Sequence, residues 1–184
     1  MSKGFVLLLD VCAQPLHSLE FVRPIQDILR HEHIVFKTLN CNTLESKFLE
    51  DCEAVIICGT SLLDESYLDD LKSFVFLKEI EKPILGICAG MQILVRLFGG
   101  SLVECLEIGL TKISLNTQFF GLKDEVEVYE LHQYAAVPDE SKFDVVAKNS
   151  SCAQIISHKK KHIVGCMFHP EVRNKEFIVN FLKK

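Results

Sequence analysis

The stretch that decides the fold is Pro83-Ile84-Leu85-Gly86-Ile87-Cys88-Ala89-Gly90-Met91-Gln92. An apolar run meets Gly-x-Cys-x-Gly and continues into an amphipathic segment, which predicts a strand, a sharp turn and a helix. Glycines on both sides of Cys88 remove Cβ atoms that would collide in so tight a turn. The positive end of the following helix favours a thiolate at this point. The segment therefore predicts a nucleophile elbow and covalent catalysis by a cysteine.

The chain around this elbow predicts an α/β fold, because expected strands and helices alternate through the first hundred residues. The expected strands are Phe5–Val11, His33–Leu39, Ala54–Cys58 and Pro83–Ile87, and the expected helices are Leu19–Glu32, Tyr67–Ile80 and Ala89–Phe98. This alternation predicts a flavodoxin-like, doubly wound and mostly parallel sheet with helices on both faces.

After Ser101 the pattern changes to consecutive short strands, which predicts a small antiparallel extension. The expected elements are strands at Leu110–Leu115, Val126–Leu131, Asp144–Ala147, Ala153–Ser157 and His162–Phe168, then a helix over Asn174–Leu182. The three lysines at 159–161 predict a solvated hairpin turn. Because the 184 residues contain no evident linker or repeat, we expect residues 1–184 to form a single domain.

Composition argues against several classes of function. The net charge of −5, with both signs interspersed, gives no support for binding nucleic acid or a membrane surface. The first apolar segment is short and ends at Asp10, which predicts a buried strand rather than a signal peptide. The eight cysteines form no Cys-x-x-Cys pair, and most lie in apolar runs. We therefore expect a cytoplasmic protein with free, buried thiols rather than a disulfide framework.

A catalytic thiol needs a base, and the base needs a group that orients it. Phe168-His169-Pro170-Glu171 supplies both at the end of the last expected strand. Residues two apart on an extended chain project to the same side, so Glu171 can hold the His169 ring. Because the carboxyl ends of parallel strands meet at one edge of a sheet, we expect His169 to lie near Cys88. The sequence thus predicts a Cys-His-Glu triad.

Together, the segments 86–92 and 168–171 resemble the class I (triad) glutamine amidotransferases, and the resemblance covers essentially the whole chain, including residues 119–125 and 132–134. It implies that Cys88 attacks the side-chain amide of glutamine, forms a glutamyl thioester and releases ammonia, after which water yields glutamate. It further implies that His169 is the general acid and base and that Glu171 is the orienting carboxylate.

The resemblance also locates an oxyanion hole, formed by the backbone N–H of Ala89 and of the loop at Gly59 and Thr60. Members of the family commonly have Gly-Gly-Pro in this loop, and Thr60 stands where the second glycine is expected. Threonine tolerates positive φ poorly. We therefore expect a hole that is misformed in the isolated chain, or one that forms only with a partner.

Three further residues are candidates for substrate binding. Gln92 follows Cys88 by one helical turn, and the resemblance implies that it supports the site or contacts glutamine. His132 and Tyr134 lie at a strand end and are expected to border the glutamine pocket, with a structural role as the alternative. We predict no metal site, because His31, His33, His158 and His162 lack the spacing of metal ligands, and no cofactor in this chain.

The chain contains no Gly-rich phosphate loop and no Ser-Gly-Gly motif of an ATP pyrophosphatase, so we expect a separate synthase to use the ammonia. The resemblance implies that this partner binds ATP and magnesium. Gly90-Met91-Gln92, Glu107-Ile108-Gly109 and Val172 are most similar to the stand-alone glutaminase subunits of GMP synthase, which serve purine biosynthesis. Those subunits commonly have Ser-His-Gly-Asp where this chain has Leu131-His132-Gln133-Tyr134. Glutaminase subunits of histidine, anthranilate or aminodeoxychorismate synthesis therefore stay open, as do a stand-alone γ-glutamyl cysteine hydrolase and a non-catalytic regulatory relative.

Overall fold

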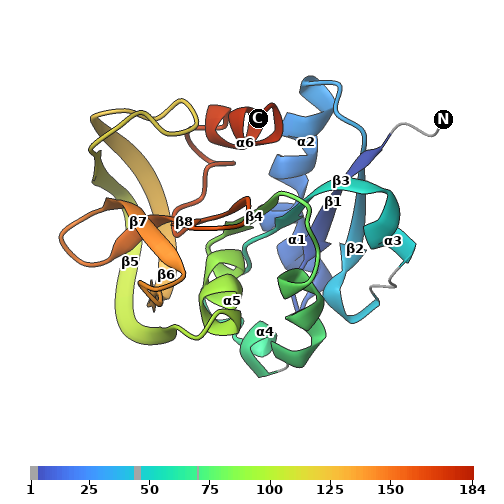
Figure 1. Cartoon of the computed structure of the whole chain (residues 1–184), viewed down its shortest axis with the longest axis horizontal. Helices are drawn as coiled ribbons and strands as arrows, with labels where there is room; N and C mark the ends of the chain where they lie inside the picture. The colour runs from blue at the N-terminus through green and yellow to red at the C-terminus, as the bar shows by residue number, and fades with distance from the viewer. Residues whose placement is uncertain (1–3, 44–46, 70) are drawn as a thin grey trace.

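The computed structural model describes residues 4–43, 47–69 and 71–184, and a nine-stranded sheet runs through it (Figure 1). The strand order is β2-β1-β3-β4-β9-β8-β7-β5-β6. The first five strands in this order are β2 (Phe36–Asn40), β1 (Phe5–Asp10), β3 (Cys52–Ile57), β4 (Ile84–Ile87) and β9 (Ile163–Cys166). They are mutually parallel, in the order of a flavodoxin-like sheet with β9 as its fifth strand. The predicted fold class is confirmed.

Alternate residues of the parallel strands point to opposite faces, and each face is covered by helices. On one face Leu8 belongs to a core shared with α1 (Pro15–Phe21), α2 (Arg23–His31) and α6 (Glu176–Leu182). On the other face Leu7 and Leu9 share a core with α4 (Ser66–Asp69), the 3₁₀ helix η2 (Leu71–Lys78) and α5 (Ala89–Leu97). Figure 1 shows α2 and α6 on one side of these strands and α4 and α5 on the other. Short helices η1 (Cys41–Thr43) and α3 (Lys47–Asp51) connect β2 to β3.

Two expected helices differ from the structure. The segment Leu19–Glu32 is divided into α1 and α2 at Val22, because Pro24 has no N–H to continue α1 and instead occupies the first turn of α2. The segment Tyr67–Ile80 is α4 followed by η2, with Asp70 outside the described residues. The buried residues of η2 are Phe74 and Leu77, whose spacing matches the three residues per turn of a 3₁₀ helix.

The antiparallel part is larger than the sequence predicted. Strand β5 covers Ser101–Leu115 and pairs along its length with β6 (Glu125–Val137). Strands β7 (Phe143–Lys148) and β8 (Ala153–His158) connect this hairpin to β9. A β-bulge interrupts the β5–β6 register between Glu104 and Glu107. The predicted lysine turn is present, since it joins the antiparallel strands β8 and β9.

Within the described ranges, no helix is both long and apolar enough to cross a membrane. All eight cysteines are free thiols.

Candidate active site

Cys88 lies between the end of β4 and the first residue of α5, and its backbone has φ 49° and ψ −104°. Positive φ is uncommon for a residue with a side chain, and such strain is concentrated at functional sites. The flanking glycines make the turn possible: a Cβ on Gly86 would lie 2.6 Å from the Gly90 carbonyl carbon, and one on Gly90 would collide with the Ile57 carbonyl oxygen. The backbone N–H of Cys88 donates to the Cys166 carbonyl at 2.7 Å, which fixes the turn to β9. The predicted elbow is present.

His169 and Glu171 follow β9 and form a buried pair. Nδ1 of His169 lies 2.7 Å from Oε1 of Glu171, and their side chains are 1% and 0% exposed. The backbone N–H of His169 donates to the Tyr129 carbonyl of β6 at 2.8 Å. Burial lowers the pKa of His169, but the charges of Glu171 and Cys88 outweigh burial and hold this pKa well above its ordinary value. Glu171 therefore stabilises the imidazolium that forms when His169 accepts a proton.

The Cys88 thiol is 4% exposed and donates to the Leu131 carbonyl of β6 at 3.5 Å. Nε2 of His169 is buried and has no hydrogen-bond partner among the described residues. Gly59, in the loop after β3, lies against both groups: a Cβ there would be 2.7 Å from Cε1 of His169 and 3.6 Å from Cβ of Cys88. The fold thus brings Cys88, His169, Glu171 and Gly59 together, and an unbonded Nε2 is available to exchange a proton.

Neither Gly59 nor Thr60 has positive φ, so the backbone strain that motivated the expectation of a misformed oxyanion hole is absent. The Thr60 hydroxyl donates to Oδ2 of Asp64 at 2.6 Å, and the same oxygen accepts the Ala13 N–H at 2.8 Å. Oδ1 of Asp64 accepts the Ser66 hydroxyl at 2.7 Å. Burial raises the pKa of Asp64, but these hydrogen bonds outweigh it and lower that pKa below its ordinary value. Asp64, which the sequence analysis missed, therefore holds the loop in place.

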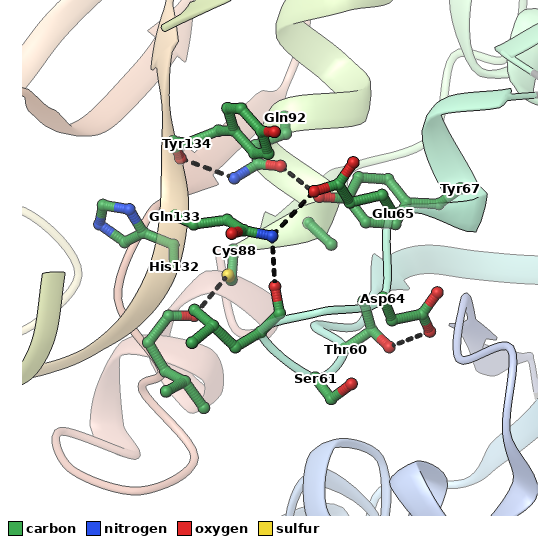
Figure 2. Close-up of a pocket in the computed structure, with 13 residues that line it drawn as sticks. Thr60, Ser61, Asp64, Glu65, Tyr67, Cys88, Gln92, His132, Gln133 and Tyr134 are labelled. Carbon is green, nitrogen blue, oxygen red and sulfur yellow. Dashed lines mark hydrogen bonds between the residues drawn. The ribbon is translucent and has the colours of Figure 1, made fainter. Parts of the chain in front are cut away.

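Gln92 is buried beside Cys88, and both ends of its amide are occupied by protein groups (Figure 2). Its Nε2 donates to the Tyr134 carbonyl at 2.8 Å, and its Oε1 accepts a hydrogen bond from the Tyr67 hydroxyl. Gln92 therefore joins α5 to β6 and α4. Of the two roles that the sequence left for it, this bonding favours support of the site.

His132 and Tyr134 differ in their relation to the pocket. Figure 2 shows the His132 ring on the far side of β6 from Cys88. Its Nδ1 lies 3.0 Å from the Cys105 carbonyl, and its side chain is 1% exposed. His132 is among the residues that line the pocket, but of the two roles that the sequence left for it this bonding favours the structural one. Tyr134 does border the pocket, where the charge of Glu65 raises its pKa.

The pocket next to Cys88 is nearly filled. Its lining comes from the loop after β3, from α4, from the start of α5 and from residues 131–134 of β6. Its free volume of about 10 Å³ suits a single water molecule. Nε2 of Gln133 crosses the pocket and donates to the Leu62 carbonyl at 2.9 Å and to Oε1 of Glu65 at 2.8 Å (Figure 2). Sequence reasoning missed this bridge, because its members are far apart in the chain and carry no motif.

Comparison with known proteins identifies close relatives of this arrangement. Residues 20–184 match the family described as glutamine amidotransferase class-I. A glutamine-hydrolyzing GMP synthase subunit of Thermoplasma acidophilum is 31% identical over 143 residues, which cover 74% of this chain and 72% of that protein. The corresponding GMP synthase subunit of Archaeoglobus fulgidus is 25% identical over 169 residues, 84% of this chain and 90% of that protein.

Comparison with solved structures identifies proteins of the same fold. A crystal structure from Thermoplasma acidophilum, of a protein provisionally described as a GMP synthase subunit, superposes with a TM-score of 0.86 at 25% identity, covering 100% of this chain and 94% of that one. A glutamine amidotransferase from Thermotoga maritima, with a TM-score of 0.73 at 23% identity, covering 98% of this chain and 81% of that one, shares the fold. Since the family match extends over most of its length and over the elbow and the His-Glu pair, this chain belongs to the class-I glutamine amidotransferase family.

Proposed function

We propose that this chain is the glutaminase subunit of a two-chain GMP synthase, with residues 1–184 acting as one amidotransferase domain in the cytoplasm. The observation that carries the proposal is the strained Cys88 beside the buried pair of His169 and Glu171. The relatives are named as one subunit of a GMP synthase, which supports a separate synthase as the partner and GMP formation as the use of the ammonia.

The proposed reaction has two halves, with glutamine as the substrate. His169 takes the proton of Cys88, and the sulfur attacks the carboxamide carbon of glutamine; the C–N bond breaks as His169 returns a proton to the leaving ammonia. Water, deprotonated by His169, then attacks the glutamyl thioester and releases glutamate and the Cys88 thiol. Throughout, Glu171 orients the ring and stabilises the imidazolium.

The oxyanion of each tetrahedral intermediate needs backbone donors. In the described part of the chain, no hydrogen bond engages the N–H of Gly59, Thr60 or Ala89. Ala89 is the first residue of α5, where the helix dipole also favours negative charge. These observations support Ala89, together with Gly59 or Thr60, as the oxyanion hole.

Glutamine needs far more room than the pocket offers, so substrate binding requires the Gln133 bridge to open. We infer that docking of the synthase, which would itself bind ATP and magnesium, opens it. Beside the bridge, residues 61–64 together with Ala13, Gln14 and His17 line a surface cavity of about 570 Å³. Leu63 is 82% exposed and Leu16, on α1, is 73% exposed, which suits an apolar interface with a partner protein.

The test is to measure glutamate release by the isolated chain, and by the chain mixed with the ATP-pyrophosphatase subunit of a GMP synthase from the same organism. We expect a low rate alone, stimulation by the partner, and GMP formed from xanthosine monophosphate, ATP and glutamine. The Cys88→Ala variant should lose glutaminase activity, while GMP formation from added ammonia continues in the complex.

Each alternative predicts a different result. Stimulation only by a histidine, anthranilate or aminodeoxychorismate synthase would replace the GMP assignment and retain the glutaminase. Full activity of the isolated chain would indicate a stand-alone γ-glutamyl hydrolase. Glutaminase activity that survives in Cys88→Ala would overturn the nucleophile, and Cys58→Ala is the matched control for loss of a buried thiol.

A further inference from the structure

Behind β6, on the side away from Cys88, lies a group of side chains that the proposed reaction does not use. We name it the rear cluster: Glu107 of β5, with Glu130 and His132 of β6, whose ligand atoms all lie within 4.8 Å of one another. Glu130 and His132 are each 1% exposed and Glu107 is 15% exposed. In Figure 2 the His132 ring lies on the far side of β6 from Cys88.

The hydrogen bond of His132 determines which ring atom faces the cluster. Nδ1 lies 3.0 Å from the Cys105 carbonyl, and a carbonyl can only accept, so Nδ1 carries a hydrogen. The β-bulge between Glu104 and Glu107 interrupts the ladder next to Cys105 and leaves its carbonyl to the ring. In the neutral imidazole, Nε2 then presents a lone pair. It lies 3.3 Å from Oε2 of Glu107 and 3.3 Å from Oε2 of Glu130.

The two carboxylates are unequally satisfied. Oε1 of Glu107 accepts the Asn149 amide at 2.8 Å, and its Oε2 has Cys152 Sγ at 3.4 Å and Gln154 Nε2 at 3.3 Å. Neither oxygen of Glu130 has a hydrogen-bond partner among the described residues, and Nε2 of His132 has none either. A buried carboxylate that faces only a histidine ring nitrogen, at 3.3 Å, is costly. Three acceptor atoms, Oε2 of Glu107, Oε2 of Glu130 and Nε2 of His132, thus lie close together.

We propose that the rear cluster is a zinc site, with Glu107, Glu130 and His132 as its protein ligands. Imidazole nitrogen and carboxylate oxygen are both donor groups by which proteins bind Zn²⁺. A tetrahedral ion with bonds of about 2.0–2.1 Å holds its N and O ligands about 3.3–3.4 Å apart, which agrees with the two distances of 3.3 Å to His132. The Cys105 carbonyl and Asn149 would orient the ligands.

A dication here would also neutralise the two carboxylates and fasten β5 to β6. Strand β6 supplies the Tyr129 carbonyl to His169 and the Leu131 carbonyl to Cys88. The proposed ion therefore supports the wall of the active site from behind. The sequence analysis predicted no metal site, because the three ligands lie on two strands and their spacing in the sequence matches no metal-binding motif.

The test uses the untagged full chain, stripped with a chelator and kept reduced with a phosphine. Bound zinc is measured by mass spectrometry of the metal and by competition with a chromophoric chelator. We expect one zinc per chain and an affinity at least about 100-fold weaker in Glu130→Gln and in His132→Gln. The matched control is His31→Gln, because His31 lies 3.4 Å from Glu32 as a histidine–carboxylate pair on the surface. This control should bind zinc like the wild type.

Cobalt(II) provides a second readout that does not depend on enzyme activity. Tetrahedral cobalt(II) absorbs visible light, and we expect this absorption in the wild type and in Cys152→Ser but not in folded His132→Gln. The proposal is overturned if the wild type binds no zinc, as would follow if His132 were simply an imidazolium between two carboxylates. It is also overturned if Glu130→Gln and His132→Gln bind zinc as tightly as the control. Should those variants not fold, zinc affinity and the cobalt spectrum of Glu107→Gln decide, and wild-type values in both would overturn it.

Discussion

Substituting Gly59 with alanine should damage catalysis without straining the backbone. Gly59 does not have positive φ, so alanine can adopt its conformation, and the added Cβ is the whole perturbation. That Cβ would lie 2.7 Å from Cε1 of His169 and 3.3 Å from its Nδ1, where an ordinary contact is at least 3.4 Å. The His169 ring must move by about 0.7 Å. The loop that carries Gly59 has little room to move instead, because it lies against the elbow and the His169–Glu171 pair.

A misplacement of about 1 Å in a catalytic group can cost about 100-fold in rate. For the smaller shift at His169 we expect kcat/KM for glutamine to fall about 50-fold, or about 2.3 kcal/mol of transition-state stabilisation. The assay is glutamate release by the complex with its synthase, alongside the Tm of the variant. Most of the loss should appear in kcat, since the ring acts on the reacting atoms.

Gly99→Ala is the matched control. Gly99 has φ +94° at the end of α5, and the nearest atom to an added Cβ is 3.7 Å away. We expect this variant to lose about 1 kcal/mol of folding free energy through backbone strain while kcat/KM stays within about twofold. The reasoning is refuted if folded Gly59→Ala keeps kcat/KM within about threefold of the wild type, since the loop would then have moved instead of His169.

Three further predictions concern the same site. Glu171→Gln removes the charge that raises the pKa of His169, so kcat should fall by about 10²–10⁴. Because His169 must be neutral to take the proton of Cys88, the acid limb of the rate profile should move to lower pH, and an unmoved limb contradicts this. Gln133→Ala removes two hydrogen bonds across the pocket, so glutamate release by the isolated chain should rise about 10-fold. The control Gln118→Ala, at an exposed position, should leave this rate unchanged. An unchanged rate in Gln133→Ala would show that the bridge does not limit access of glutamine. Asp64 has a lowered pKa, so its contribution to stability is present above the unfolded pKa of about 4 and is lost as the pH falls. Asp64→Asn should therefore be less stable than the wild type at pH 7, with the difference shrinking below about pH 4 in denaturant unfolding, and exposed Asp69→Asn should show no such trend.

The elbow and the His-Glu pair could be predicted because each is encoded within a few residues at a strand end. Glycines at 86 and 90 are required by local crowding, and the two-residue spacing of His169 and Glu171 follows from extended backbone. Parallel pairing of β4 with β9 aligns Ile87 with Cys166, and this brings the elbow next to the His-Glu pair.

The sequence analysis fell short where the structure depends on contacts between residues that are far apart in the chain. Thr60 stands in place of a glycine, but the sequence does not reveal that the Asp64 carboxylate fixes its loop in an unstrained conformation. The direction of the His132 side chain depends on the register of β5 with β6 and on a bulge that no local pattern marks. The sequence analysis predicted too short a strand for β5. Leu106, Ile108 and Leu110 alternate along it and are apolar, but they face outward, so burial does not explain their alternation.

The nearly filled pocket has a consequence for the chemistry of the resting protein. A thiol that is favoured as a nucleophile is also the group most readily converted to a sulfenic acid by peroxides or consumed by electrophiles. Cys88 is 4% exposed and lies behind the Gln133 bridge. While this bridge is closed, neither glutamine nor such reagents can reach its sulfur. The same barrier that prevents idle release of ammonia therefore also shields the sulfur from oxidation, and opening the pocket exposes it to both.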